Sequence, residues 1–180
     1  MKRNSRQRIL DAALELFAKD GYKATTIDSI AKKAEVNELT IFRQFKNKKN
    51  LFKTIISNST EKFKNEYFAM IFDEDYKDPK EFLESIIKRI AKITDDNIEF
   101  LRLTVLEKIE EEEPLNEIIP HLAMLIGKNI KNEKIDAFAF TLTITGAFIL
   151  LSNNKYLGRI TVNHEILEKM LINNFIQCIN

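Results

Sequence analysis

Apolar residues recur at helical spacing in three short stretches of the first fifty residues. In the first stretch, over residues 6–19, they share one face of a helix: Ile9, Ala12, Ala13, Leu16 and Phe17. Gly21 ends this helix, because glycine tolerates the left-handed conformation found at helix C-termini. A second helix is predicted over residues 27–34 behind a threonine cap, and a third over 38–45 behind Asn37. Two short helices joined by a tight turn and packed on a longer one are typical of a helix-turn-helix.

Longer apolar stripes follow from residue 48 onward, separated by short polar segments. The stripe that begins at Leu51 and Phe52 predicts a connecting helix that ends near residue 73. Further helices are predicted over residues 79–94, 98–112, 115–129, 134–152 and 163–178. No stretch alternates as a strand ladder does. The predicted fold class is therefore all-α, with about nine helices: a three-helix DNA-binding domain at 1–47 and a helical bundle at 48–180.

An uncharged segment lies between Asp136 and Lys155. Its apolar residues occupy every side of the predicted helix, which is the pattern of a helix buried all round. The 15 residues from Ala137 to Leu151 fall short of the ~20 that span a membrane, so a buried protein helix is favoured over a membrane span. We predict that this helix and the last one form a four-helix interface between two subunits. The predicted interface residues are Phe140, Ile144, Ile149, Leu167, Met170, Leu171 and Phe175.

The net charge of +1 is unevenly distributed along the chain. Residues 1–52 carry twelve Lys or Arg and six Asp or Glu, whereas residues 53–180 carry sixteen and twenty-one. A basic small domain suits a polyanion, whose condensed counterions are released on binding. On charge alone, a solvated lysine-rich surface is the alternative. A single cysteine, Cys178, and the lack of a secretory signal pattern at the start agree with a cytoplasmic protein.

A spaced set of positions follows the first predicted helix. These positions are Gly21, Tyr22, Thr25, Thr26, Ile30, Ala31, Ala34, Val36, Asn37, Thr40, Ile41, Phe42, Phe45, Lys48, Leu51 and Phe52. The pattern resembles the tetracycline-repressor (TetR) family of bacterial and archaeal regulators. The resemblance implies a transcriptional regulator, most simply a repressor, that binds a two-fold operator in double-stranded DNA as a homodimer and is released by a small, apolar effector. Beyond residue 52 the chain is similar to the family only in its helical architecture.

The resemblance also implies roles for individual residues of the first domain. Contacts to the DNA backbone, which fix register, are expected from Thr25, Thr26, Lys46 and Lys48. Contacts to bases are expected from the outer side of the third helix: Glu38, Leu39, Thr40, Arg43 and Gln44. Asn37, as the cap of this helix, and Phe42, as an aromatic wedge that packs it, complete the predicted DNA-binding set, with core packing as the first role of Phe42. Gln44 suits adenine, Arg43 suits guanine or a phosphate, and Leu39 suits a thymine methyl group. Helix capping alone is the alternative for the threonines and for Asn37.

Several positions depart from the family's pattern. The family often has Gly at Glu35, a basic residue at Glu38, a small one at Leu39, Tyr at Phe42, and His or Tyr at Gln44. The operator sequence therefore does not follow from the resemblance. For Glu38, stabilisation of the helix start is favoured over reading of cytosine, because a carboxylate is repelled by DNA. The alternative function is a helical ligand-binding or interaction protein that has lost specific DNA recognition.

Ten of the thirteen phenylalanines lie at or beyond Phe52. Five are predicted to line a cavity for an apolar effector, with plain packing as the alternative: Phe68, Phe72, Phe100, Phe138 and Phe148. His121 and His164 stand alone, without paired-cysteine or HExxH spacing, so no metal site is predicted. The sequence has no glycine-rich phosphate loop and no nucleophile elbow, so neither a cofactor nor an enzymatic activity is predicted.

Overall fold

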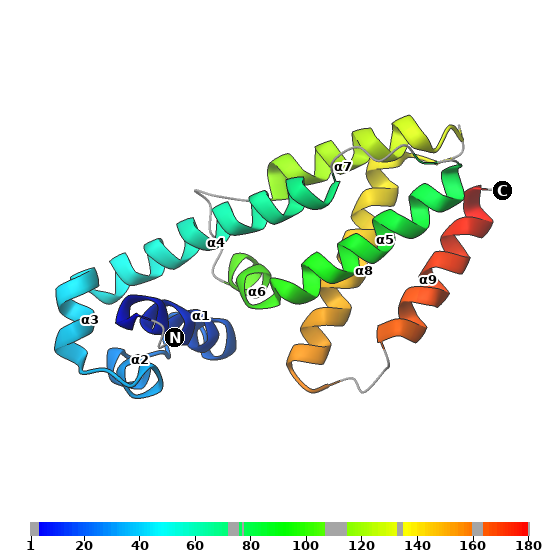
Figure 1. Cartoon of the computed structure of the whole chain (residues 1–180). Helices are drawn as coiled ribbons and strands as arrows, with labels where there is room; N and C mark the ends of the chain where they lie inside the picture. Colours follow the sequence, from blue (N-terminus) through cyan, green and yellow to red (C-terminus); the bar gives the residue numbers. More distant parts are fainter. Residues whose placement is uncertain are drawn as a thin grey trace. The chain divides into compact units, whose positions relative to one another are not determined.

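The computed structural model describes residues 4–71, 76, 78–106, 115–132, 135–159 and 164–179. Within these ranges the chain forms nine helices and no strand, which confirms the predicted all-α class (Figure 1). The helices are α1 Ser5–Asp20, α2 Ile27–Ala34, α3 Glu38–Phe45, α4 Lys48–Ile71, α5 Pro79–Asp96, α6 Ile98–Leu106, α7 Leu115–Asn129, α8 Ala137–Tyr156 and α9 His164–Ile179. The predicted extension of α6 to residue 112 lies outside the described residues.

Polar side chains set where several helices begin. Thr26 caps α2, and the side chain of Asn37 accepts a hydrogen bond from Leu39 N at 2.8 Å, so the predicted starts of α2 and α3 are confirmed. Asp136 caps α8 in the same way, accepting from Ala139 N at 2.7 Å. Each cap satisfies a backbone donor that the first helical turn leaves without a partner. α8 spans 20 residues, five more than the apolar stretch predicted for it.

Contacts between Cα atoms divide the chain into two compact units. The first unit comprises Met1–Lys62 and Glu99–Glu113, and the second comprises Phe63–Ile98 and Pro114–Asn180. Most of α6 therefore belongs with the N-terminal helices: Leu103 is 0% exposed in their core, and Arg102 Nε donates to the Ala18 carbonyl at 3.0 Å. The bounds of the compact units thus differ from those of the domains predicted at residues 1–47 and 48–180.

A single apolar core holds the helices of the first unit together. Its buried members include Ile9, Ala13, Phe17, Ile30, Ile41, Phe45, Leu51, Ile55 and Leu103. The Phe17 ring lies 5.6 Å from the Tyr22 ring and 5.3 Å from the Phe52 ring, which links α1, the following turn and α4. Because α3 contributes Ile41 and Phe45 to this core, its opposite side is left facing outward.

In the second unit, α5 packs against α8 and α9, and α7 packs against α8 (Figure 1). The buried apolar residues of these helices include Phe82, Leu83, Ile86, Ile87, Ile90, Leu122, Ile126, Phe140, Ile144, Phe148 and Ile172. At one end of α5, Asp95 accepts from Ser152 Oγ at 2.5 Å and from Lys155 Nζ at 2.8 Å. These contacts fix the C-terminal end of α8 against α5.

Candidate nucleic-acid interface

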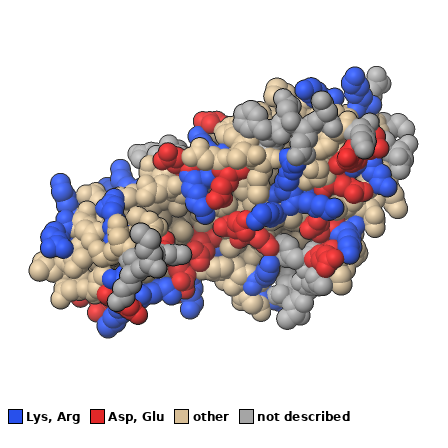
Figure 2. All heavy atoms as spheres, in the orientation of Figure 1, with Lys and Arg blue, Asp and Glu red and all other residues tan. Residues whose placement is uncertain are grey.

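The outward side of α3 carries large apolar side chains between charged ones. Leu39 is 73% exposed and Phe42 is 44% exposed, although both are apolar. Arg43, one residue beyond Phe42, is also exposed, and Lys46 follows one turn later. Glu38 is exposed at the start of the helix, whereas Thr40 is half-buried. In Figure 2, Lys and Arg side chains lie at the surface over α2 and α3. The outward side of α3 therefore offers an apolar centre with cations at its C-terminal end.

Gln44 does not lie on this outward side. Its side-chain Nε2 donates to Ser5 Oγ at 3.1 Å, at the start of α1, and its Oε1 is buried without a hydrogen-bond partner among the described residues. A side chain turned inward in this way cannot form the paired hydrogen bonds that read adenine. The structure therefore corrects the prediction that Gln44 reads a base.

Thr25 is also placed differently from its prediction. It is only 2% exposed, and its hydroxyl lies within hydrogen-bond distance of two carbonyl oxygens, that of Gly21 at 2.9 Å and that of Leu16 at 3.1 Å. A hydroxyl buried on these acceptors stabilises the turn between α1 and α2 and does not reach DNA. We therefore assign Thr25 a structural role in place of the predicted phosphate contact.

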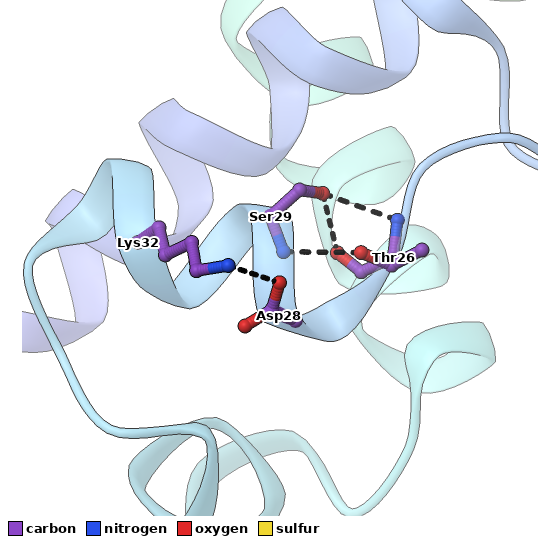
Figure 3. A network of polar contacts seen from close by, with 4 residues as sticks. All are labelled: Thr26, Asp28, Ser29 and Lys32. Atoms are coloured by element: carbon purple, nitrogen blue, oxygen red, sulfur yellow. Dashed lines mark hydrogen bonds and ion pairs between the residues drawn. The ribbon is translucent and has the colours of Figure 1, made fainter.

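Thr26 lies at the surface at the start of α2, as a phosphate contact requires. Its oxygen accepts from Ser29 N at 3.0 Å, and Ser29 Oγ accepts from Thr26 N at 3.1 Å, which completes a capping box that the sequence reading missed (Figure 3). Asp28 accepts from Lys32 at 2.7 Å, and this hydrogen bond and the charge of Asp28 raise the pKa of Lys32. The oxygen of Thr26 is occupied as an acceptor, so its O–H remains available as a donor.

Lys48, in the first turn of α4, is half-buried and points back toward the turn between α1 and α2. Its Nζ donates to the carbonyl oxygens of Tyr22 and Thr25, each at 2.8 Å, and lies 4.4 Å from the centroid of the Tyr22 ring. An ammonium group has three N–H donors, so one remains for a phosphate oxygen. Because the Thr25 carbonyl precedes the Thr26 cap, this cation adds positive charge beside the N-terminus of α2.

Lys48→Ala is expected to have two separate effects. Loss of two hydrogen bonds from a half-buried cation should lower the free energy of unfolding by about 1.5–3 kcal/mol, measured by urea denaturation. Loss of one phosphate contact should weaken binding to all DNA and flatten the dependence of log K on log salt by about one unit. Lys49→Ala, at the exposed neighbouring position, serves as the stability control and should change it by less than about 0.5 kcal/mol. Equal stability losses in the two variants, or an unchanged salt slope for Lys48→Ala, would each contradict one of these roles.

Two residues with positive φ flank α3. Glu35 adopts the left-handed helical conformation with φ 54°, and its carboxylate lies 3.5 Å from the Arg8 guanidinium. Lys46, at the other end, has φ 67°. Such conformations favour glycine, which agrees with the glycine that the family often has at the position of Glu35. The tight turn of the helix-turn-helix therefore forms here without glycine.

The phenylalanines predicted for an effector cavity differ in burial and in the compact unit to which they belong. Phe148 is fully buried, Phe138 is 49% exposed, and Phe100 lies in the first unit, whereas Phe68 lies in the second. Phe72 lies outside the described residues. The structure therefore corrects Phe138 from a cavity lining to a surface position, and a shared lining by the other phenylalanines stays a prediction.

A polar contact that the sequence reading missed lies beside Phe68. The Tyr67 hydroxyl lies 3.1 Å from His121 Nδ1 and 3.3 Å from the Ile118 carbonyl oxygen, and the Phe68 and His121 ring centroids are 5.5 Å apart. Burial raises the pKa of Tyr67. Tyr67 and His121 are 54 positions apart, so no local sequence spacing indicated this contact. Across the described part of the chain, no group of three or more His, Cys, Asp or Glu is placed to hold a metal ion.

Several residues predicted for a subunit interface are used within one chain instead. Phe140 and Ile144 are buried, and the Phe140 ring packs edge-on against Phe175 at 4.7 Å, which joins α8 to α9. Ile149 and Leu171 are half-buried, and the side chain of Leu167 lies outside the described residues. Of the predicted set, Met170 remains mostly exposed. The structure therefore corrects Phe140 and Ile144 from interface to core, whereas Phe175 is half-buried beside Phe140.

Other apolar residues of α8 and α9 face outward instead. These residues are Phe138, Leu142, Leu150, Ile166 and Met170. Gly146 lies four residues from both Leu142 and Leu150, and a Cβ added there would meet no atom of the described residues beyond its own helix backbone and chain neighbours within 4 Å. α8 is the one helix among those described that is long and apolar enough to cross a membrane. Only 28% of its most apolar 18-residue window is buried. We call the outward residues of α8, from Phe138 to Leu150, the outer face of α8.

Comparison with protein families matches residues 9–55 to the family model described as bacterial regulatory proteins, tetR family. The HTH-type transcriptional regulator YvkB of Bacillus subtilis is 54% identical over 55 residues, which cover 31% of this chain and only 29% of that relative. The HTH-type transcriptional regulator YhgD of Bacillus subtilis is 30% identical over 164 residues, covering 84% of this chain and 81% of that relative. The fatty acid metabolism regulator protein of Bacillus subtilis is 32% identical over 125 residues, covering 66% and 62%.

Solved structures of regulators share the fold over nearly the whole chain. AibR, solved with isovaleryl coenzyme A and operator DNA, has a TM-score of 0.73 and 13% identity, covering 94% of this chain and 96% of that one. The regulator FadR of Bacillus subtilis, solved with stearoyl-CoA, has a TM-score of 0.65 and 20% identity, covering 93% and 95%. At these identities the similarity establishes the arrangement of helices in each case.

Proposed function

Because the chain belongs to the TetR family of bacterial regulatory proteins, which are regulators and not enzymes, we propose that it represses transcription as a homodimer bound to a two-fold operator. In this proposal a small apolar effector releases the protein from DNA. Repression needs only steric blocking of a promoter, so it is the simpler mechanism. We place the protein in the cytoplasm, where its DNA target lies.

The observation that carries this proposal is the outward side of α3. Leu39 and Phe42 are exposed three residues apart at its centre, and a contiguous apolar patch rimmed by charged residues is typical of an interaction site. α3 is fixed from behind by Ile41 and Phe45, as a helix that enters the major groove must be. Thr26 and Lys48 add backbone contacts at the start of α2.

Support for the homodimer comes from the outer face of α8. A glycine inside a helix costs about 1 kcal/mol relative to alanine, and within the described part of the chain no other segment crowds the space beside Gly146. A helix from a second copy that approaches closely at this point would account for the glycine and would cover Leu142 and Leu150. We favour a second copy over a membrane, because the matching relatives are named as transcriptional regulators.

The effector is proposed to carry an acyl chain. Support comes from the fatty acid metabolism regulator of Bacillus subtilis, which matches 66% of this chain, and from the apolar core of the second unit. Within that core, the Tyr67 and His121 contact supplies polar groups of the kind that orient an apolar ligand. An effector releases DNA only if it binds the released state more tightly than the bound one.

The test begins with selection of binding sequences from random duplex DNA, followed by fluorescence anisotropy. We expect the selected sites to be inverted repeats, bound more tightly than unrelated duplexes, and released by acyl-CoA thioesters added in a series of chain lengths. Binding to acyl-CoA without any preference among duplexes would favour the alternative function, a helical ligand-binding protein that has lost specific DNA recognition. Tight, selective DNA binding that no acyl-CoA alters would contradict the effector class alone.

Substitution of deoxyuridine for thymine in the selected operator tests the apolar centre of α3. The base feature that suits Leu39 and Phe42 is the thymine methyl group, and deoxyuridine removes only that group. Affinity is expected to fall about fourfold for each methyl that the protein covers. The affinity of Leu39→Ala should fall less than that of the unaltered protein when deoxyuridine replaces thymine, because this variant already lacks one of the side chains that contact the methyl group. Equal affinity of the unaltered protein for both duplexes would contradict thymine recognition.

A further inference from the structure

A hollow of about 340 Å³ lies between the start of α1, the end of α3 and the first half of α4. Its polar lining consists of Arg6, Gln44, Lys46, Asn50, Lys53 and Thr54. Three of these six residues are cations, and the lining, all of it within the described residues, includes no acid. One water molecule in the liquid occupies about 30 Å³, so the hollow has room for a phosphate group with bound water molecules.

One of these cations is held in place by an aromatic ring. The Arg6 guanidinium carbon lies 4.6 Å from the centroid of the Phe45 ring, a cation–π contact that keeps the charge at the rim of the hollow. Phe45 is itself buried in the core of the first unit, so the platform beneath Arg6 is rigid. Three cations around one hollow raise the local positive potential, which attracts an anion.

Lys46 connects the hollow to the outward side of α3. It follows α3 directly, four residues after the exposed Phe42, and it also lines the hollow. Its φ of 67° is a conformation that glycine adopts at lower cost, so the backbone tolerates strain at the position that carries this cation. An anion in the hollow would therefore lie at the edge of the surface that faces DNA.

We propose that this hollow binds a phosphate of the DNA backbone, with Arg6, Lys46 and Lys53 as its cationic contacts. The proposal rests on the proposed DNA-binding function and adds a second backbone anchor, separate from the one at Thr26 and Lys48. The two anchors lie at opposite ends of the helix-turn-helix: one at the start of α2 and the other at the end of α3. Together they would fix α3 in the groove from both sides.

The experiment measures anisotropy of a labelled duplex against salt concentration for the full chain and for Arg6→Gln, Lys53→Gln and Lys19→Gln. Lys19 is the matched control, since it is exposed on α1 about 20 Å along the helix from Arg6. Arg6→Gln and Lys53→Gln should each lower the slope of log K against log salt by about 0.9. Neither should change the order of preference among duplexes, whereas Lys19→Gln should keep the slope of the unaltered protein.

The outcomes separate this proposal from the function on which it rests. An unaltered protein that binds no duplex would contradict DNA binding itself. Normal salt-dependent binding, with unchanged slopes for both Arg6→Gln and Lys53→Gln, would overturn the phosphate site alone. Circular dichroism checks whether Arg6→Gln remains folded, since this substitution removes the contact with Phe45. If it is unfolded, the slope of Lys53→Gln alone decides whether the hollow binds phosphate. Inorganic phosphate that shifts the Asn50 side-chain amide signal in NMR, with both slopes unchanged, would assign the hollow to a free anion and would also overturn the proposal.

Discussion

The double variant Leu142→Lys with Leu150→Lys is expected to be monomeric at micromolar concentration and to bind a two-fold operator about 100-fold or more weakly. Both side chains are exposed on the outer face of α8, so the substitutions should leave the fold of one chain intact. In a dimer they would bury four unpaired ammonium groups, which is strongly unfavourable. The added positive charge should by itself favour DNA binding. A loss of affinity would therefore reflect loss of the DNA-binding domain that the second subunit contributes.

The measurements are sedimentation for mass and anisotropy for DNA affinity. Asn116→Lys, at an exposed position of α7, is the control and is expected to remain dimeric with unchanged affinity. The double variant should bind a duplex that holds a single half-site as the unaltered protein does, because its reading helix is untouched. A dimer of normal mass in the double variant would contradict the proposed interface.

Leu103→Ala is expected to lower the free energy of unfolding by about 2–5 kcal/mol. Leu103 lies on α6, yet it is fully buried in the core formed by α1 to α4, where truncation leaves a cavity. Urea denaturation followed by circular dichroism at one fixed protein concentration is suitable, because the chain has no tryptophan and the proposed dimer makes stability depend on concentration.

Leu39→Ala provides the matched control for that measurement. The same side chain is shortened in the same unit, but at a position that is 73% exposed, so the expected change is within about 0.5 kcal/mol. Similar losses in the two variants would show that Leu103 does not pack in the core of the first unit.

The first fifty residues reveal most of their fold because their signals are local. Thr26 and Asn37 cap helices that begin at the next residue, and Ile41 and Phe45 lie one turn apart on the buried side of α3. Caps and helical spacing involve residues at most a few positions apart, which a sequence displays directly. The bounds of α2 and α3 therefore agree with prediction residue for residue.

The errors arise where a choice depends on contacts between distant segments. α8 is apolar on all sides, so its sequence gives no contrast to distinguish buried Ile144 from exposed Leu142. Gln44 turns inward because Ser5 lies beside it, 39 positions earlier in the chain. Leu103 joins the N-terminal core from a helix that begins at Ile98. None of these pairings leaves a periodic or local mark in the sequence.

The residues that hold α3 in place are not those on its outward side. Ile41, Phe45 and the Asn37 cap fix the helix, whereas Glu38, Leu39, Phe42 and Arg43 project outward. Exposed positions of this kind usually change stability by less than about 0.5 kcal/mol when substituted. In the proposed function these four positions face the operator, so a duplicated copy of the gene could acquire a new target sequence through a few changes at them while keeping its fold. The same four positions form a compact library for directing the protein to a chosen promoter.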